Sequence, residues 1–125
     1  MVDSREMTIT GIDHVQVAAP AGCEDVARAF YGTLLGLAEV PKPEPLRARG
    51  GCWFRAGDQE LHVGVVDSFA PSLKAHPGFV TVDLDAVRAE LRGAGIETID
   101  DDAIPGVSRF YAADPFGNRL EFRQA

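Results

Sequence analysis

The sequence predicts an α+β fold made of two similar modules, each running strand, helix, strand, strand, strand. The first observation is a repeated histidine: His14 and His76 each lie at the start of a strand-like segment that leads into a helix. The second is that both helical segments end at a glycine followed by an apolar residue. We therefore expect one domain spanning residues 1–125, built from modules at about residues 9–66 and 76–125.

The spacing within the two halves supports a duplication. The histidine precedes the helix-ending glycine by 22 residues in the first half and by 19 in the second. The interval from Gly36 to His62 is 26 residues, and so is the interval from Gly95 to Glu121. His62 therefore takes the position that Glu121 holds in the second module. An insertion or deletion of one or two residues would shift this match, and Glu60 lies on the same strand face as His62.

The composition is that of an ordinary globular domain, with 46% hydrophobic and 25% charged residues. A net charge of −7 argues against nucleic acid and anionic membrane surfaces as partners, because both require a basic footprint. The longest apolar run is far shorter than a membrane span. Residues 1–8 read as an unstructured leader without the apolar core of a secretory signal, so we expect a cytoplasmic protein. Cys23 and Cys52 are expected to be buried free thiols.

The first module begins with a strand at residues 9–19, whose alternation places His14 and Gln16 on one face and Val15 and Val17 on the helix-packed face. Helical spacing of apolar residues predicts a helix over residues 23–35. The elements that follow are a short strand at 37–40, a proline-rich irregular loop at 41–49, and a hairpin formed by residues 51–55 and 60–66.

The second module repeats this order after a connection at residues 67–75. A strand over residues 79–82 leads to a helix capped by Asp83 or Asp85 and ended by Gly95. Residues 96–99 are strand-like, and the acidic run at 100–102 is expected to be a solvated turn. A last hairpin, 108–113 and 119–123, encloses a turn at residues 114–118, where proline and glycine favour turn geometry.

Two histidines and one carboxylate favour a metal site that brings the two modules together. His14, His76 and Glu121 are the primary candidates, with Glu60 or His62 beside them. Imidazole nitrogens with a carboxylate suit divalent iron, zinc, manganese or nickel better than calcium or magnesium. Such a set leaves coordination positions open for a chelating substrate. Glu60 could serve as a further ligand or as a base.

Further candidates lie near these ligands in sequence and parity. Gln16 shares a strand face with His14 and is a candidate substrate contact. Trp53 and Phe54 must face opposite sides of their strand, so one packs against the helices and the other can face the substrate. Arg109 and Tyr111 lie within a strand and are candidate substrate contacts.

Taken together, these segments resemble the vicinal oxygen chelate superfamily, which includes glyoxalase I, fosfomycin-resistance thiol transferases, extradiol dioxygenases and bleomycin-resistance proteins. The matching segments span nearly the whole chain, and the most specific is the turn that leads into Leu-Glu. They are Gly11–Val15, Ala29–Tyr31 with Leu35–Leu37, His76–Asp85 and Asp114–Glu121.

The resemblance implies paired βαβββ modules whose strands form an open, curved, glyoxalase-like cup around a metal. It implies ligands His14, His76 and Glu121, with a further glutamate position that falls near Glu60 or His62. The expected function is a metal-dependent lyase, transferase or dioxygenase acting on a small oxygen-chelating substrate. The alternative is a metal-free drug- or metabolite-binding protein of the bleomycin-resistance type. The resemblance also implies a homodimer, whose cup is closed either within one chain or by exchange of modules between two.

Overall fold

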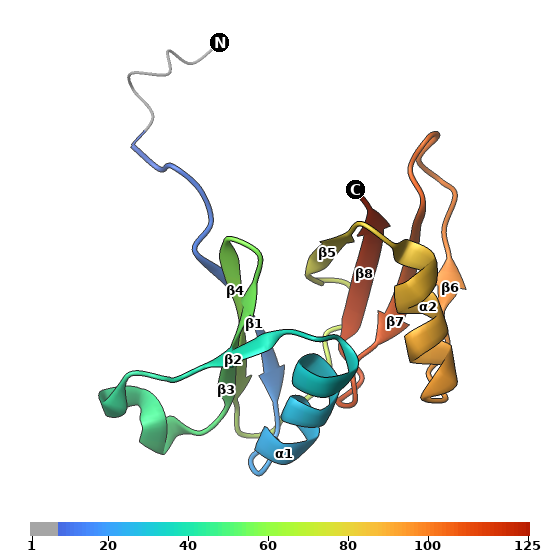
Figure 1. Cartoon of the computed structure of the whole chain (residues 1–125). Helices are drawn as coiled ribbons and strands as arrows, with labels where there is room; N and C mark the ends of the chain where they lie inside the picture. The colour runs from blue at the N-terminus through green and yellow to red at the C-terminus, as the bar shows by residue number, and fades with distance from the viewer. Residues whose placement is uncertain (1–7) are drawn as a thin grey trace.

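The computed structural model describes residues 8–125 and contains two four-stranded sheets, one from each half of the chain (Figure 1). The first module contributes β1 (His14–Ala19), β2 (Ala38–Val40), β3 (Cys52–Ala56) and β4 (Gln59–Val65). The second contributes β5 (Gly78–Thr81), β6 (Ile99–Asp100), β7 (Arg109–Ala113) and β8 (Arg119–Gln124). Except for residue 8, the expected leader lies outside the described residues.

The two sheets have the same topology. Their strand orders are β1-β4-β3-β2 and β5-β8-β7-β6. In each sheet the first strand of the module lies parallel to its last strand, and the other neighbours are antiparallel. The predicted α+β fold of two repeated βαβββ modules is thereby confirmed.

The helices match the predicted positions but differ in two details. The helix expected over residues 23–35 consists of α1 (Glu24–Ala27) continued by a π-helical segment, η2 (Arg28–Leu34), which buries the adjacent aromatic residues Phe30 and Tyr31. The prediction of an irregular loop at 41–49 was wrong, because a 3₁₀ helix, η3 (Glu44–Arg49), occupies most of it. Its proline lies in the first turn, where the missing N–H has no helical partner to lose.

In the second module, α2 (Leu84–Gly93) begins at Asp83, whose side chain accepts a hydrogen bond from the Ala86 backbone N–H at 3.1 Å. Asp83 is thus the capping residue of the two candidates. The strand expected at residues 96–99 is shorter and later, at Ile99–Asp100.

Alternation along the strands separates an apolar face from a polar face in each sheet. Val17 and Ala19 of β1 and Phe54 of β3 are buried toward the first helix, where Tyr31 packs against Phe54. In the second sheet, Phe110 stacks on Phe122 on the same side as α2. This parity leaves the polar side chains of both sheets on the opposite faces.

A buried hydrogen-bond network fastens the second module to the first. Asp114 is 5% exposed and accepts a hydrogen bond from the Tyr31 hydroxyl at 2.7 Å. Asn118 donates from Nδ2 to the Ala18 carbonyl at 2.8 Å, and its Oδ1 accepts from the Ser72 N–H at 3.0 Å. The turn at residues 114–118 therefore joins the helix and first strand of one module to the last hairpin of the other.

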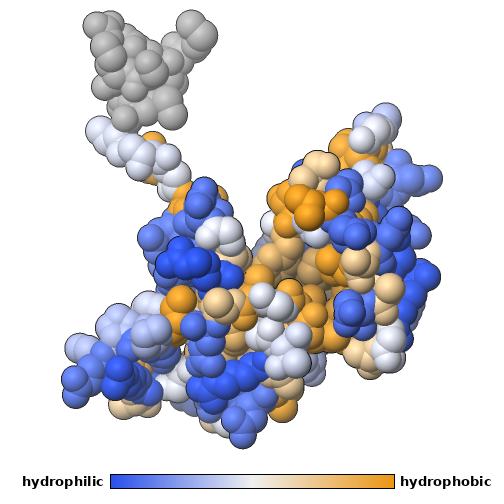
Figure 2. Space-filling model, in the orientation of Figure 1, coloured by the Kyte–Doolittle hydropathy of each residue, from blue (hydrophilic) through white to orange (hydrophobic). Residues whose placement is uncertain are grey.

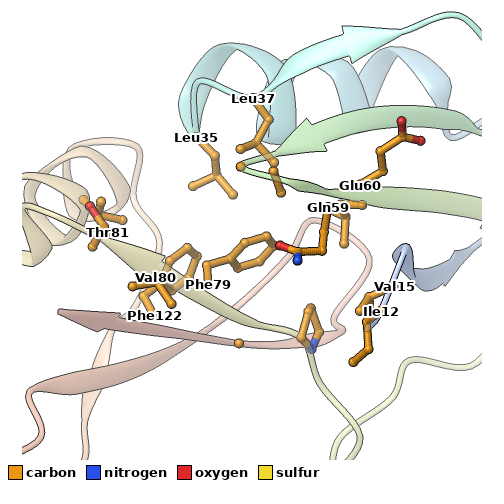
Figure 3. A pocket seen from close by; sticks show the side chains of 16 residues that line it. Ile12, Val15, Leu35, Leu37, Gln59, Glu60, Phe79, Val80, Thr81 and Phe122 are labelled. Carbon is orange, nitrogen blue, oxygen red and sulfur yellow. The ribbon is translucent and has the colours of Figure 1, made fainter. Parts of the chain in front are cut away.

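The first strand of each module lies at the edge of its sheet, and β1 and β5 do not pair with each other. Between these edges lies a cleft of about 530 Å³, lined mostly by apolar side chains. Figure 3 shows Ile12 and Val15 facing it from the first module, and Phe79 and Phe122 from the second. Figure 2 shows the same region as a hollow lined with hydrophobic residues. No helix within residues 8–125 has the length and apolar character needed to span a membrane.

The network predicts a large stability loss when Asp114 is removed. Tyr31→Phe should lower the free energy of unfolding by about 1.5–3 kcal/mol, the usual value of a hydrogen bond to a charged group. Asp114→Ala should cost more, because Tyr31, Asn118 and the Phe116 N–H all lose their acceptor. Urea unfolding measures both values. Asp102→Ala, at an exposed position, is the control and should stay within about 0.5 kcal/mol of the wild type; equal losses for all three variants would refute the role of the network.

Candidate functional site

The first group of candidate residues lies on the polar face of the first sheet, and we call it the first half-site: His14, Gln16, Trp53, Glu60 and His62. The register explains why they share a face, because His14 lies opposite Glu60, and His62 lies between Gln16 and Trp53 across neighbouring strands. Side chains at paired positions of adjacent strands point to the same side of a sheet.

Three rings of the first half-site form a continuous stack. The Trp53 indole lies on the His62 ring with a centroid distance of 3.8 Å and an angle of 2°. His62 in turn stacks on His14 at 4.1 Å and 15°. Trp53 is therefore the polar-face member of the Trp53–Phe54 pair; alternation predicted only that the two face opposite sides.

Within this stack, His62 is enclosed and Glu60 remains accessible. His62 is 4% exposed, and its Nε2 lies 2.9 Å from Glu60 Oε1. The other oxygen of Glu60 lies 3.7 Å from the Arg55 guanidinium, and the Glu60 side chain is 25% exposed. Both ring faces of His62 and its Nε2 are thus occupied by neighbours, whereas Glu60 can reach a ligand.

The second half-site lies on the polar face of the second sheet and comprises His76, Arg109, Tyr111, Arg119, Glu121 and Arg123. His76 Nε2 lies 3.0 Å from Glu121 Oε1, and the Glu121 side chain is 9% exposed. His76 Nδ1 lies 2.8 Å from the Lys74 carbonyl. Because a carbonyl only accepts, Nδ1 carries a proton and points the opposite nitrogen at the carboxylate.

Arg109 connects three other side chains of this region by hydrogen bonds. Its Nη1 donates to the Tyr111 hydroxyl at 2.9 Å and to Glu121 Oε1 at 3.2 Å, while Nη2 donates to Asp101 at 3.2 Å. The Ala103 N–H that bonds to Asp101 holds the pKa of this carboxyl below its ordinary value, and Arg109 adds to the effect. Asp101 therefore stays ionised as a fixed partner of Arg109.

The donor chemistry of the two half-sites fits a first-row divalent cation. In the first half-site, His14 Nδ1 lies 3.0 Å from Asp13 Oδ2, and in the second the Lys74 carbonyl fixes His76. Such outer contacts orient imidazoles whose other nitrogen binds metal. His76 and Glu121 already lie side by side with their donor atoms converging.

The structure does not bring the two half-sites together within one chain. His14, His62 and Glu60 lie on the first sheet. Glu121 lies on the second sheet beside His76, which precedes β5 in the chain. No cluster of three or more histidine, cysteine, aspartate or glutamate side chains able to hold a metal occurs within residues 8–125. The metal set His14, His62, His76 and Glu121 stays a prediction that a single chain does not complete.

The remaining predicted contacts differ in their accessibility. Gln16 is exposed and lies over Gly64, where an added Cβ would come within 2.7 Å of its amide carbon. Arg109 and Tyr111 are partly buried and bonded to each other. Sequence reasoning missed Arg119 and Arg123, although both lie two residues from Glu121 on a strand and therefore share its face. Strand parity was the signal that could have found them.

The two cysteines play no part in either half-site. Both are buried free thiols, as expected. Burial is the main reason that the pKa of Cys23 is raised to about 12 and that of Cys52 to about 11. A thiol that stays protonated at neutral pH is a poor nucleophile and a poor metal ligand.

Comparison with known proteins identifies close structural relatives. A glyoxalase family protein from Bacillus anthracis is 58% identical, with a TM-score of 0.92 over 94% of this chain and 97% of that one. Lactoylglutathione lyase from Agrobacterium tumefaciens shares the fold at 21% identity and a TM-score of 0.73, over 95% of this chain and 96% of that one. The fosfomycin resistance protein FosX from Listeria monocytogenes shares the fold at 15% identity and a TM-score of 0.75, over 94% of this chain and 95% of that one. No protein-family model and no curated protein matches the sequence.

The raised thiol pKa values predict slow alkylation of the native protein. At pH 8, iodoacetamide should modify Cys23 and Cys52 at least about a hundredfold more slowly in buffer than in urea, because few thiolates form in the fold. The native rate should keep rising with pH above 9, whereas the unfolded chain should level off near its ordinary thiol pKa. Mass spectrometry over time measures both rates, and equal rates would contradict the assignment.

Proposed function

Because the chain belongs to the glyoxalase family within the vicinal oxygen chelate superfamily, we propose that it is a metal-dependent enzyme acting on a small oxygen-chelating substrate, as a lyase, transferase or dioxygenase. The observation that carries this proposal is the His76–Glu121 pair. His76 Nε2 and Glu121 Oε1 converge to 3.0 Å, and the two side chains are 24% and 9% exposed. A divalent cation could bind both atoms at once, because an imidazole nitrogen and a carboxylate oxygen are both suitable ligands for a first-row transition metal.

The proposed ligands are His14, His76 and Glu121, with Glu60 beside them. When bound, iron, zinc, manganese or nickel would polarise substrate oxygens. Glu60 is the candidate proton acceptor, because it is partly exposed and its Oε1 is held by His62. We assign His62 to holding Glu60 and His14 in place, since its ring is enclosed between Trp53 and His14.

We further propose that a second copy of the chain completes each site. Within residues 8–125, β1 and β5 each have one edge that pairs with no other strand, and each edge belongs to a sheet that carries one half-site. Pairing β1 of one copy with β5 of the other would place His14 and Glu60 beside His76 and Glu121 of the second copy. Both edges border the same apolar cleft, so one two-fold contact would cover the unpaired backbone and the cleft together.

The second candidate function is a metal-free small-molecule binding protein. The apolar cleft favours it, because about 530 Å³ is in the range of drug-sized binding sites. This alternative requires the cleft to stay open in the assembled protein. It therefore predicts a protein without stoichiometric metal whose ligand contacts Phe79 and Phe122.

Metal content separates the two functions. Protein produced with iron, zinc, manganese and nickel available should carry about one ion per chain by elemental analysis, and His76→Ala should reduce this to background. Glu97→Gln, at an exposed carboxylate, is the matched control and should keep the ion. A wild type without metal would overturn the enzyme proposal and leave the binding protein.

Mixing two inactive variants tests whether sites form between chains. His14→Ala and Glu121→Ala should each lose metal alone. A heterodimer isolated with two different affinity tags should hold about half the wild-type metal, because exchange creates one intact site and one doubly altered site. If each site formed within one chain, the heterodimer would hold none.

A further inference from the structure

Three arginines gather on the polar face of β7 and β8 in a chain whose net charge is −7. The strand register places Arg109 opposite Arg123, Tyr111 opposite Glu121 and Ala113 opposite Arg119. The carboxylates that contact these arginines are Glu121 and Asp101. The face therefore carries more cationic than anionic groups, contrary to the balance of the whole protein.

The three arginines are not equally engaged. Both terminal nitrogens of Arg109 are engaged, Nη1 by Tyr111 and Glu121 and Nη2 by Asp101, and its side chain is 12% exposed. Arg123 Nε lies 3.1 Å from Glu121 Oε2. Arg119 differs, because among residues 8–125 no carboxylate lies within ion-pair distance of its guanidinium.

The guanidinium of Arg119 is nevertheless held in place. Its Cζ lies 3.7 Å above the centre of the Tyr111 ring. Stacking on an aromatic face immobilises the planar group while leaving its edge N–H donors free. The Arg119 side chain forms no hydrogen bond with another residue in the part of the chain that the structure describes, residues 8–125. An ordered, partly buried guanidinium of this kind suits a carboxylate or a phosphoryl group, which it can bind through two parallel hydrogen bonds.

Tyr111 also links this arginine to the proposed ligands. The His76 ring lies edge-on to Tyr111, with a centroid distance of 5.5 Å and an angle of 83°. Arg119 and Glu121 are two residues apart on one strand face, which separates them by roughly 7 Å along the strand. An anion at Arg119 would thus lie within one small molecule's length of the His76–Glu121 pair.

We propose that Arg119 is the anion-recognition residue of the substrate site and that the substrate carries a carboxylate or a phosphoryl group close to its chelating oxygens. This inference rests on the proposed function for the identity of the neighbouring ligand pair. If Glu121 bound a cation, its negative charge would offset the charges of Arg109 and Arg123 less. The local potential on this face would then be more positive and would favour an anion further.

The test is a titration of the whole protein, as purified, with acetate, methylphosphonate and neutral acetamide, followed by the NMR signals of the arginine Nε–H groups. Acetate or methylphosphonate should shift the Arg119 signal saturably, and acetamide should not. Arg119→Gln should weaken binding by about tenfold or more, as loss of a charged hydrogen-bonding partner implies. Because variants at position 119 lack the Arg119 signal, their affinity is read from the Nε–H signals of Arg109 and Arg123 on the same face, which the wild type also provides.

Matched variants separate recognition from general charge. Arg49→Gln removes an exposed arginine in η3 and should change the affinity less than about twofold. Arg119→Lys keeps the positive charge but lacks the planar guanidinium that forms two parallel hydrogen bonds, and it should give an intermediate affinity. If Arg119→Gln alters the spectrum broadly, the lysine variant provides the comparison. Equal affinity in the wild type and in Arg119→Lys or Arg119→Gln would overturn the proposal, and so would the absence of saturation in the wild type.

A second titration after metal removal by a chelator distinguishes this proposal from the proposed function. Binding that persists without metal and depends on Arg119 supports the anion site even if elemental analysis finds no ion. If binding is lost when the metal is removed and its affinity is unchanged by Arg119→Gln, the anion binds to the metal. That result would refute the role of Arg119.

Discussion

The arrangement of this chain depends on one buried carboxylate. Asp114 accepts hydrogen bonds from the Tyr31 hydroxyl, the Asn118 amide and two backbone N–H groups, and it is almost wholly shielded from water. Burial, followed by the charge of Asp114, raises the pKa of Tyr31, so the phenol stays a donor under all ordinary conditions. A buried charge is tolerated only with such complete partners. Because the partners come from both modules, the same network sets how one sheet lies relative to the other.

That constraint explains why the chain presents two half-sites rather than one site. The network joins the modules at the turn between β7 and β8 and at the end of β1. In the described part of the chain, the outer edges of β1 and β5 have no strand partner, and they lie on either side of an apolar cleft (Figure 3). Exposed backbone edges and apolar surface are both unfavourable in water. The proposed two-fold assembly removes both costs while it brings the donor groups together.

Much of this fold follows from local patterns in the sequence. The opposite orientations of Trp53 and Phe54, the polar face of β1 and the repeated βαβββ order all follow from strand alternation and helical spacing. The π-helical winding of η2 was not predictable, because it accompanies the burial of Phe30 and Tyr31 against tertiary partners. The separation of His14 from His76 was also beyond sequence reasoning. It depends on the tertiary hydrogen bond between Asp114 and Tyr31, which are 83 residues apart along the chain.

The ring stack of the first half-site has an optical consequence. Trp53 is the single tryptophan of the chain, and its indole lies flat on His62, which lies on His14. Its fluorescence therefore comes from one known place, in direct ring contact with His62 and one ring away from the proposed ligand His14. Only the His62 ring lies between His14 and the indole, so a change in the charge or position of His14 should alter the Trp53 fluorescence. The protein thus carries its own spectroscopic label at the site, with no need for an attached dye.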